Sequence, residues 1–267
     1  MGWAAPDVRI SYAQNLEDVR LFKALGDRTP GFWVDVGAAD PDRWTVTRLF
    51  SERGWTGINV EPGPAFALLE ERRPHDVNVR AAIGLGEGEV EFTVSWPIPE
   101  LSSLDPARAA ARPEVERTET VRVPLVSLAA LLDEHAAGRR VDFLKVDVEG
   151  GERAVLASND WTRHRPSVVV VEAIDSVTRV PNHDEWEEIL LEAGYRVAVF
   201  DGLNRYYVVD DEPELLEPLA AQICVFDVSA FAAELEVREE LSERARALAA
   251  EVGGLAEVVA LRDRQIA

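Results

Sequence analysis

The sequence predicts an α/β fold built around a mostly parallel sheet. Short apolar runs rich in β-branched residues alternate with stretches of helical periodicity, which is the pattern of consecutive strand and helix units. We expect strands at residues 32–36, 57–60, 76–83, 90–95, 121–124 (an edge strand), 141–146 and 168–172. We expect helices at residues 15–25, 44–53, 64–72, 128–135 and 184–193.

Two further segments refine this organisation. Residues 195–200 and 205–209 flank the turn sequence Asp-Gly-Leu-Asn, which predicts a β-hairpin. Residues 97–117 carry prolines at positions 97, 99, 106 and 113. This segment is expected to be a loop inserted between two strands, and long inserted loops often cover functional sites.

The C-terminal residues have a different pattern, so we divide the chain into a domain at 1–228 and a helical tail at 229–267. A heptad spacing predicts a coiled-coil seam formed by Leu241, Ala245, Leu248, Val252, Leu255 and Val259. The glycines at 253–254 weaken the helix, and a helix packed on its own domain is the alternative. We expect a homo-oligomer formed through this helix. Because the pattern is unfinished at Ala267, we also expect that it leads to a further domain.

The composition excludes several classes of protein. The 267 residues include 28 Lys and Arg against 49 Asp and Glu, a net charge of −21, which argues against binding to nucleic acids or anionic membranes. No apolar run approaches the roughly 20 residues that span a bilayer, and no signal peptide is recognisable, so a cytoplasmic protein is expected. A single cysteine, Cys224, excludes an intrachain disulfide and a multi-cysteine metal site.

A nucleotide site is predicted where the first two buried strands end. Ligands of open α/β sheets lie beyond the carboxyl ends of the strands. Asp35, Gly37 and Asp40 lie in or after the first strand, and Glu61 ends the second. Glycine permits a close backbone approach to a ligand, and an acid at the second position is suited to ribose hydroxyls. The alternative is that Asp35 and Glu61 only cap the strand ends.

The residues after Gly37 favour S-adenosylmethionine (SAM) over a dinucleotide. A dinucleotide requires further glycines and a loop free of acids, whereas Ala38 and Ala39 follow Gly37 and Asp40 lies where a pyrophosphate would bind. Carboxylates attract the sulfonium and amino groups of SAM. Only two lysines are present, and neither belongs to a Tyr-x-x-x-Lys pair or to a phosphate-binding Gly-Lys-Ser/Thr loop.

A second acidic cluster follows the later buried strands. Asp147, Glu149 and Glu172 are expected on the same rim of the sheet. They form a candidate site for a divalent cation such as Mg²⁺, with a solvated acidic rim as the alternative. Lys145 lies in an apolar strand, where an unpaired ammonium is costly, so we expect it to pair with a carboxylate.

Six segments resemble, in order, the FkbM family of SAM-dependent methyltransferases. They are residues 11–18 (SYAQNLED), 32–40 (FWVDVGAAD), 54–62 (GWTGINVEP), 101–105 (LSSLD), 143–152 (FLKVDVEGGE) and 201–208 (DGLNRYYV). The resemblance implies the class I methyltransferase fold, a Rossmann-like sheet of seven strands with the last antiparallel. It also implies O-methylation of sugars or of hydroxyls in natural products.

The resemblance assigns roles to individual residues. It implies that SAM is bound by Asp35, Gly37, Ala38 and Asp40 at its methionine part, by Glu61 and Pro62 at its ribose, and by Ala81 and Ala82 near its adenine. Asp147 would face the transferring methyl group. The family often has Asn where this chain has Ala39, so one hydrogen bond to SAM is expected to be missing.

The chemistry is expected to need a base near the acceptor hydroxyl. His183 and Asp147 are the candidates, and the acceptor is expected to contact Gln14, Asn15, Ser102, Ser103 and Arg205. The predicted function is SAM-dependent O-methylation of a sugar, glycan or glycosylated natural product. The alternatives are an NAD-type enzyme, or a catalytically idle protein that uses the coiled coil for assembly.

Overall fold

The computed structural model describes residues 10–224, 226–228, 230–232, 235, 241, 243, 244 and 246. Of the six predicted heptad positions, only Leu241 belongs to this set, so the coiled coil lies outside the described residues and stays a prediction. Among the described residues, no helix is long and apolar enough to span a bilayer.

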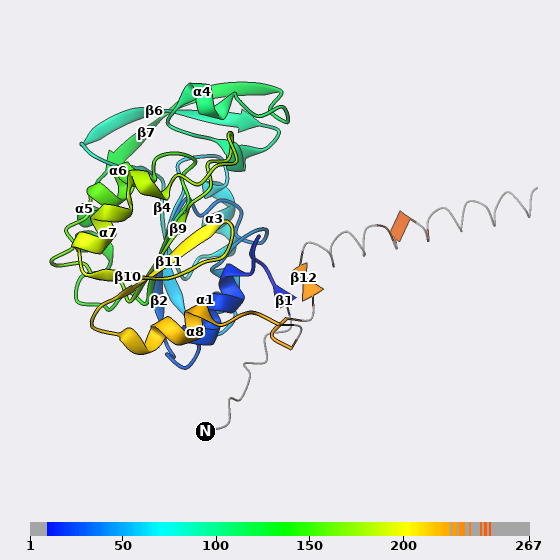
Figure 1. Cartoon of the computed structure of the whole chain (residues 1–267). Helices are drawn as coiled ribbons and strands as arrows, with labels where there is room; N and C mark the ends of the chain where they lie inside the picture. Colours follow the sequence, from blue (N-terminus) through cyan, green and yellow to red (C-terminus); the bar gives the residue numbers. More distant parts are fainter. Residues whose placement is uncertain are drawn as a thin grey trace, which may run out of the picture.

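The predicted α/β architecture is confirmed, with a seven-stranded sheet at its centre (Figure 1). The strands follow the spatial order β10 (Tyr195–Phe200), β11 (Asn204–Val209), β9 (Val168–Glu172), β8 (Phe143–Val146), β2 (Phe32–Val36), β3 (Thr56–Val60) and β4 (Val77–Val79). Strand β11 runs antiparallel to both of its neighbours, and every other neighbouring pair is parallel. The carboxyl ends of β2, β3, β8 and β9 therefore lie at one edge.

A separate three-stranded sheet corrects two predictions. Its order is β5 (Ala82–Ile83), β7 (Arg117–Val126) and β6 (Gly88–Trp96). The single strand predicted at 76–83 is wrong, because β4 pairs in the main sheet while β5 pairs with β7. The strand predicted at 121–124 is present within β7, but its predicted edge position is wrong, because β7 is the central strand of this sheet. A third, two-stranded sheet pairs β1 (Ile10–Ser11) with β12 (Ala230–Phe231).

The insert at 97–117 connects the antiparallel strands β6 and β7, as predicted for a segment between two strands. It contains η1 (Pro99–Leu101) and α4 (Pro106–Ala109). The side chain of Asp105 caps α4 by accepting hydrogen bonds from the backbone N–H groups of Ala107 and Arg108. In Figure 1 the three-stranded sheet and α4 lie together at one end of the main sheet.

The helix predicted at 128–135 is confirmed, whereas the other predicted helices are shorter than the periodicity predicts. The helices are α1 (Glu17–Leu25), α2 (Arg48–Ser51), α3 (Phe66–Arg72), α5 (Leu128–His135), α6 (Glu152–Ala157), α7 (Glu187–Glu192) and α8 (Leu216–Ala220), with short η2 (His183–Glu185) and η3 (Pro213–Leu215). The helix predicted at 44–53 shrinks to α2, and Trp44, with φ of 53°, is not helical. The helix predicted at 184–193 is interrupted at Trp186, where φ is −138°.

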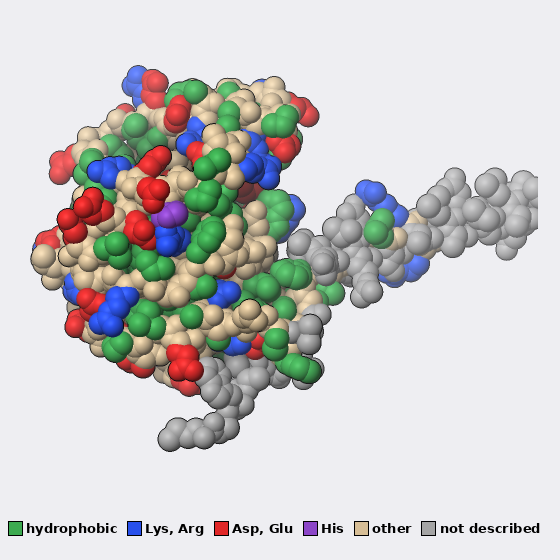
Figure 2. All heavy atoms as spheres, viewed as in Figure 1, with side chains coloured by type: hydrophobic (Ala, Val, Ile, Leu, Met, Phe, Trp, Pro, Cys, Tyr) green, Lys and Arg blue, Asp and Glu red, His purple; other side chains and the backbone are tan. Residues whose placement is uncertain are grey.

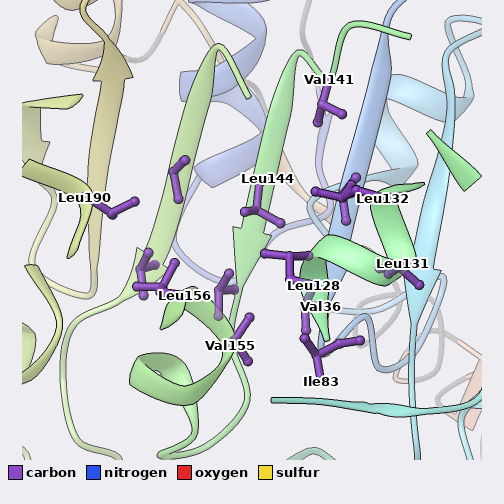
Figure 3. Close-up of a cluster of buried hydrophobic side chains, with 14 of the residues drawn as sticks. Val36, Ile83, Leu128, Leu131, Leu132, Val141, Leu144, Val155, Leu156 and Leu190 are labelled. Carbon is purple, nitrogen blue, oxygen red and sulfur yellow. The ribbon is translucent and has the colours of Figure 1, made fainter. Parts of the chain in front are cut away.

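Two hydrophobic clusters pack on opposite faces of the main sheet, because successive strand side chains alternate in direction. Val36 and Leu144 face α5 and α6, whose contributions include Leu128 and Val155 (Figure 3). Trp33 and other residues on the opposite face pack with side chains of α1, α2 and α8. These layers fix the strand ends, and the loops that follow them form the site.

Candidate functional site

Two cavities open at the carboxyl edge of the main sheet. Their volumes are about 600 Å³ and about 1240 Å³. They adjoin, because Gly37, Ala39, Glu100, Asp147 and Glu149 line both of them. Elongated ligands of α/β proteins bind in such crevices outside the strand ends.

The smaller cavity is largely apolar. Ala81, Ala82 and Phe92 line one part of it, and Glu61 and Pro62 line another. An apolar slot with a few polar groups at one end suits a flat heterocycle joined to a polar group. The resemblance had assigned Ala81 and Ala82 to such a position, and both are buried in the cavity wall.

The turn after β2 requires glycine at position 37. Gly37 has φ of 86°, and a Cβ atom there would lie 1.8 Å from the backbone oxygen of Asp147. The backbone N–H groups of Gly37 and Ala38 both donate to the oxygen of Val60, at 3.0 and 3.1 Å. The turn is therefore packed tightly between the ends of β3 and β8.

Glu61 connects two of these loops. Its carboxylate accepts hydrogen bonds from the backbone N–H of Ala39 at 3.0 Å and of Gly63 at 2.6 Å. Burial raises its pKa to about 7, against the opposing effect of these hydrogen bonds. Glu61 therefore caps the strand end, as the alternative interpretation of the sequence expected, and it also lines the smaller cavity.

Asp35 carries an unsatisfied acceptor. Its side chain lines the larger cavity and is 2% exposed, and its Oδ1 atom has no hydrogen-bond partner among the described residues. Burial raises its pKa to about 6, although the neighbouring ammonium of Lys145 opposes the shift. A buried acceptor without a donor is costly, so this position favours a ligand that brings a donor or a positive charge.

Lys145 is paired as predicted. Its Nζ atom lies 2.9 Å from Oδ2 of Asp147. Burial alone would lower its pKa, but the charges of Asp147 and Asp35 outweigh burial and raise the pKa above its ordinary value. The ammonium therefore stays charged and holds Asp147 at the junction of the two cavities.

The other acids on the rim are shifted by burial and mutual repulsion. Burial and the charge of Asp147 raise the pKa of Glu149 to about 7, and they raise the pKa of Glu172 to about 10. The hydroxyl of Ser176 donates a hydrogen bond to Glu149. At neutral pH, Glu149 is therefore partly protonated and Glu172 is protonated.

The divalent-cation prediction receives no support. Among the described residues, one set of His, Asp or Glu side chains brings three ligand atoms within 4.8 Å of one another, and it consists of His183, Asp184 and Glu187. That set does not include Asp147, Glu149 or Glu172, and none of its members lines either cavity.

The predicted acceptor residues are only partly brought together. Gln14 lines the larger cavity and Ser102 the smaller. Four predicted residues lie outside both described linings, namely Asn15, Ser103, His183 and Arg205. Arg205 pairs instead with Glu187 at 3.1 Å, and the hydroxyl of Ser103 donates to the backbone oxygen of Glu149 at 2.8 Å. Asp40 lies beside the site, in a neighbouring hollow that also contains Glu61.

Sequence reasoning missed several lining residues, including Trp44, Glu100, Arg112 and Arg179. Of the five non-glycine residues with positive φ in the described chain, four line these cavities, namely Ala39, Trp44, Glu149 and Arg179. Strained backbone of this kind concentrates at functional sites. The sequence does not reveal these positive-φ residues, because their residue types usually adopt other backbone conformations.

The fold and the site together define an α/β protein with two adjoining cavities at the carboxyl edge of its sheet, where proteins of this architecture bind their ligands. A sequence model of the methyltransferase FkbM domain matches residues 35–197, more than half of the chain. The chain therefore belongs to the FkbM methyltransferase family. All residues that line the two cavities lie within the matched range, except Gln14 and Leu203. No curated protein matches the chain.

Proposed function

We propose that this protein transfers the methyl group of SAM to a hydroxyl of a sugar, glycan or glycosylated natural product. The observation that carries the cofactor assignment is the buried Oδ1 atom of Asp35, which has no hydrogen-bond donor among the described residues and belongs to a side chain that lines the larger cavity. The amino group of SAM would supply that donor. Membership of the FkbM family supports the reaction type.

The remaining residues fit the same cofactor. Glu61 would accept from the ribose hydroxyls, and the wall formed by Ala81, Ala82 and Phe92 would hold the adenine. The bound cofactor supplies an activated methyl group on a positively charged sulfur. The buried carboxylates favour that charge and disfavour the diphosphate of a dinucleotide.

The chain's own part in the reaction is to orient the acceptor and accept its proton. Asp147 lies at the junction of the cavities and is held by Lys145, so we assign it to orienting the hydroxyl. Glu149 also lines both cavities, and its pKa of about 7 suits a general base near neutral pH. His183 lies outside both linings, so the carboxylates are the better candidates.

Methyl-labelled SAM and a panel of glycosides test this function. We expect transfer of the label to a hydroxyl, with an alkali-stable ether as product, and loss of transfer in Asp35→Asn. Glu149→Gln should keep cofactor binding, but the rate of methyl transfer should no longer change with pH near pH 7. The matched change Asp105→Asn, at the cap of α4, should leave transfer intact, because Asn also caps helices well. Transfer of the label only to an amine or carboxylate would contradict the proposal.

A further inference from the structure

The larger cavity has an acidic floor at the strand ends and a mouth lined by basic and aromatic side chains. Trp44, Arg112 and Arg179 line it from three separate segments, which are the loop after β2, the insert between β6 and β7, and the loop after β9. In a chain of net charge −21, such a gathering of arginines is unusual. Figure 2 shows Lys and Arg side chains grouped where the three-stranded sheet meets the larger body of the molecule.

Trp44 lines the mouth with an exposed side chain, although its backbone has an unfavourable left-handed conformation. It is 46% exposed and has φ of 53°, whereas Trp33, Trp55 and Trp186 are buried in the core. The guanidinium carbon of Arg43 lies 5.2 Å from the centroid of the Trp44 ring. An exposed aromatic face on a strained backbone, at a cavity mouth, offers a flat platform on which the apolar face of a sugar ring can pack.

The arginines retain donors for an anion. Arg112 donates from Nη1 to the backbone oxygen of Ser176 at 2.8 Å, and its Nε lies 3.5 Å from Glu114. These contacts fix the group but use only part of its five N–H donors. The guanidinium of Arg179 makes no hydrogen bond with any described residue. Arginine pairs favourably with carboxylate and phosphate, because its donors match two oxygens at once.

The floor of the cavity fixes the direction of such a ligand. The charges of Asp35 and Asp147 there exceed that of Lys145, so an anion placed beside them would be repelled. A charged substituent therefore belongs at the mouth, while a neutral hydroxyl reaches inward to Asp147. Glu114 offsets part of the charge of both Arg112 and Arg179, and the N–H groups of the Arg179 guanidinium keep no hydrogen bond to any described residue.

We infer that the acceptor is an anionic sugar, whose ring packs on Trp44 and whose carboxylate or phosphate is bound by Arg112 and Arg179. This inference rests on the proposed function, since it orients the ligand by its reacting hydroxyl. It narrows the acceptor to a uronic acid or a sugar phosphate, either free or as part of a larger glycan.

Direct binding to the protein loaded with S-adenosylhomocysteine tests the inference. The probes are methyl glucoside, methyl glucuronoside and glucose 6-phosphate, titrated by calorimetry at low salt. We expect at least one anionic probe to bind about tenfold more tightly than the neutral probe, with the preference falling as salt is added. The two anionic probes separate a carboxylate ligand from a phosphate ligand.

Variants test whether the residues at the mouth cause the preference for an anionic probe. Arg179→Gln should remove most of the preference for the anionic probe, and Trp44→Ala should weaken all probes that bind. The control Arg122→Gln removes an exposed positive charge on β7, outside both cavity linings, and should change nothing. Equal binding of the three probes, binding of none, or a preference unaffected by Arg179→Gln would overturn the inference. Failure of S-adenosylhomocysteine to bind would instead contradict the proposed function.

Discussion

The floor and the mouth of the site are built in opposite ways. The floor is formed at the ends of β2 and β8, where Asp35 and Lys145 are buried and their charges are set by burial and by each other. The mouth is formed by loops and by the insert, where Arg112 and Arg179 are partly or largely exposed to solvent. Parallel strands thus position the shared chemistry, and segments outside the sheet supply the features that select an acceptor.

The largest difference between the floor and the mouth is expected in the stability of variants that lose a cation from each region. Lys145→Met leaves the buried Asp35 and the partly buried Asp147 without their partner, so we expect a loss of about 3–5 kcal/mol in the free energy of unfolding at pH 8. The loss should shrink toward pH 5, because Asp35 can then take up a proton. Arg112→Met breaks a more exposed contact and should change stability far less. Urea unfolding at the two pH values measures both, and equal losses would erase the distinction between floor and mouth.

A carboxylate can be removed from each region in the same way. Asp35→Asn should raise the dissociation constant for S-adenosylhomocysteine about 100-fold, since a hydrogen bond to a charged group is worth about 1.5–3 kcal/mol. Glu114→Gln, in the insert and at the larger cavity alone, should change it by less than about threefold, as for a weak, solvent-screened interaction. Calorimetric titration gives both constants. A larger effect at Glu114 would place the cofactor under the insert rather than on the floor.

Two glycines with similar backbone angles separate strain from steric contact. Gly37 and Gly202 both have positive φ, but a Cβ atom at Gly202 would meet nothing within 4 Å. The free energy of unfolding of both alanine variants should fall by about 1–3 kcal/mol because of backbone strain. Gly37→Ala should lower the free energy of unfolding more than Gly202→Ala does, because its methyl group collides with the end of β8. It should also weaken cofactor binding. Similar melting temperatures for the two variants would show that the floor is less tightly packed than the structure indicates.

The smallest effect concerns the pH dependence of stability. Burial raises the pKa of Glu61 to about 7 in the folded protein, from about 4.3 in an unfolded chain. Its contribution is complete below the unfolded value and has been lost once the pH exceeds about 7, so the unfolding free energy should fall by at most about 1.4 kcal/mol per pH unit between these two values. Glu61→Gln should flatten this slope. At the mouth, the pKa of Glu114 is lowered by a backbone hydrogen bond and by Arg112, so Glu114→Gln should not flatten it.

The predictability of the site follows the same division. The positions of Asp35, Gly37, Glu61 and Asp147 at one edge of the sheet were predictable, because apolar runs indicate buried strands and the ends of parallel strands share one edge. The pairing of Lys145 was predictable from the cost of a buried charge. These inferences depend only on local sequence and on the topology of parallel sheets.

The mouth was not predictable by these means. Residues 44–53 have helical periodicity, yet Trp44 leaves the helix in a left-handed conformation. The break between β4 and β5, and with it the three-stranded sheet, depends on pairing with the distant strand β7. His183 was assigned by its place in the chain, and only the packing of η2 and α7 shows that it lies outside the cavity linings.

Equilibrium dialysis of the full chain against radiolabelled SAM tests the central claim most directly. One SAM should be retained per chain, displaced by S-adenosylhomocysteine and not by NAD⁺, and retention should be lost in Asp35→Asn but kept in Asp105→Asn. Absence of saturable retention, or displacement by NAD⁺, would contradict the assignment of the cavity to this cofactor.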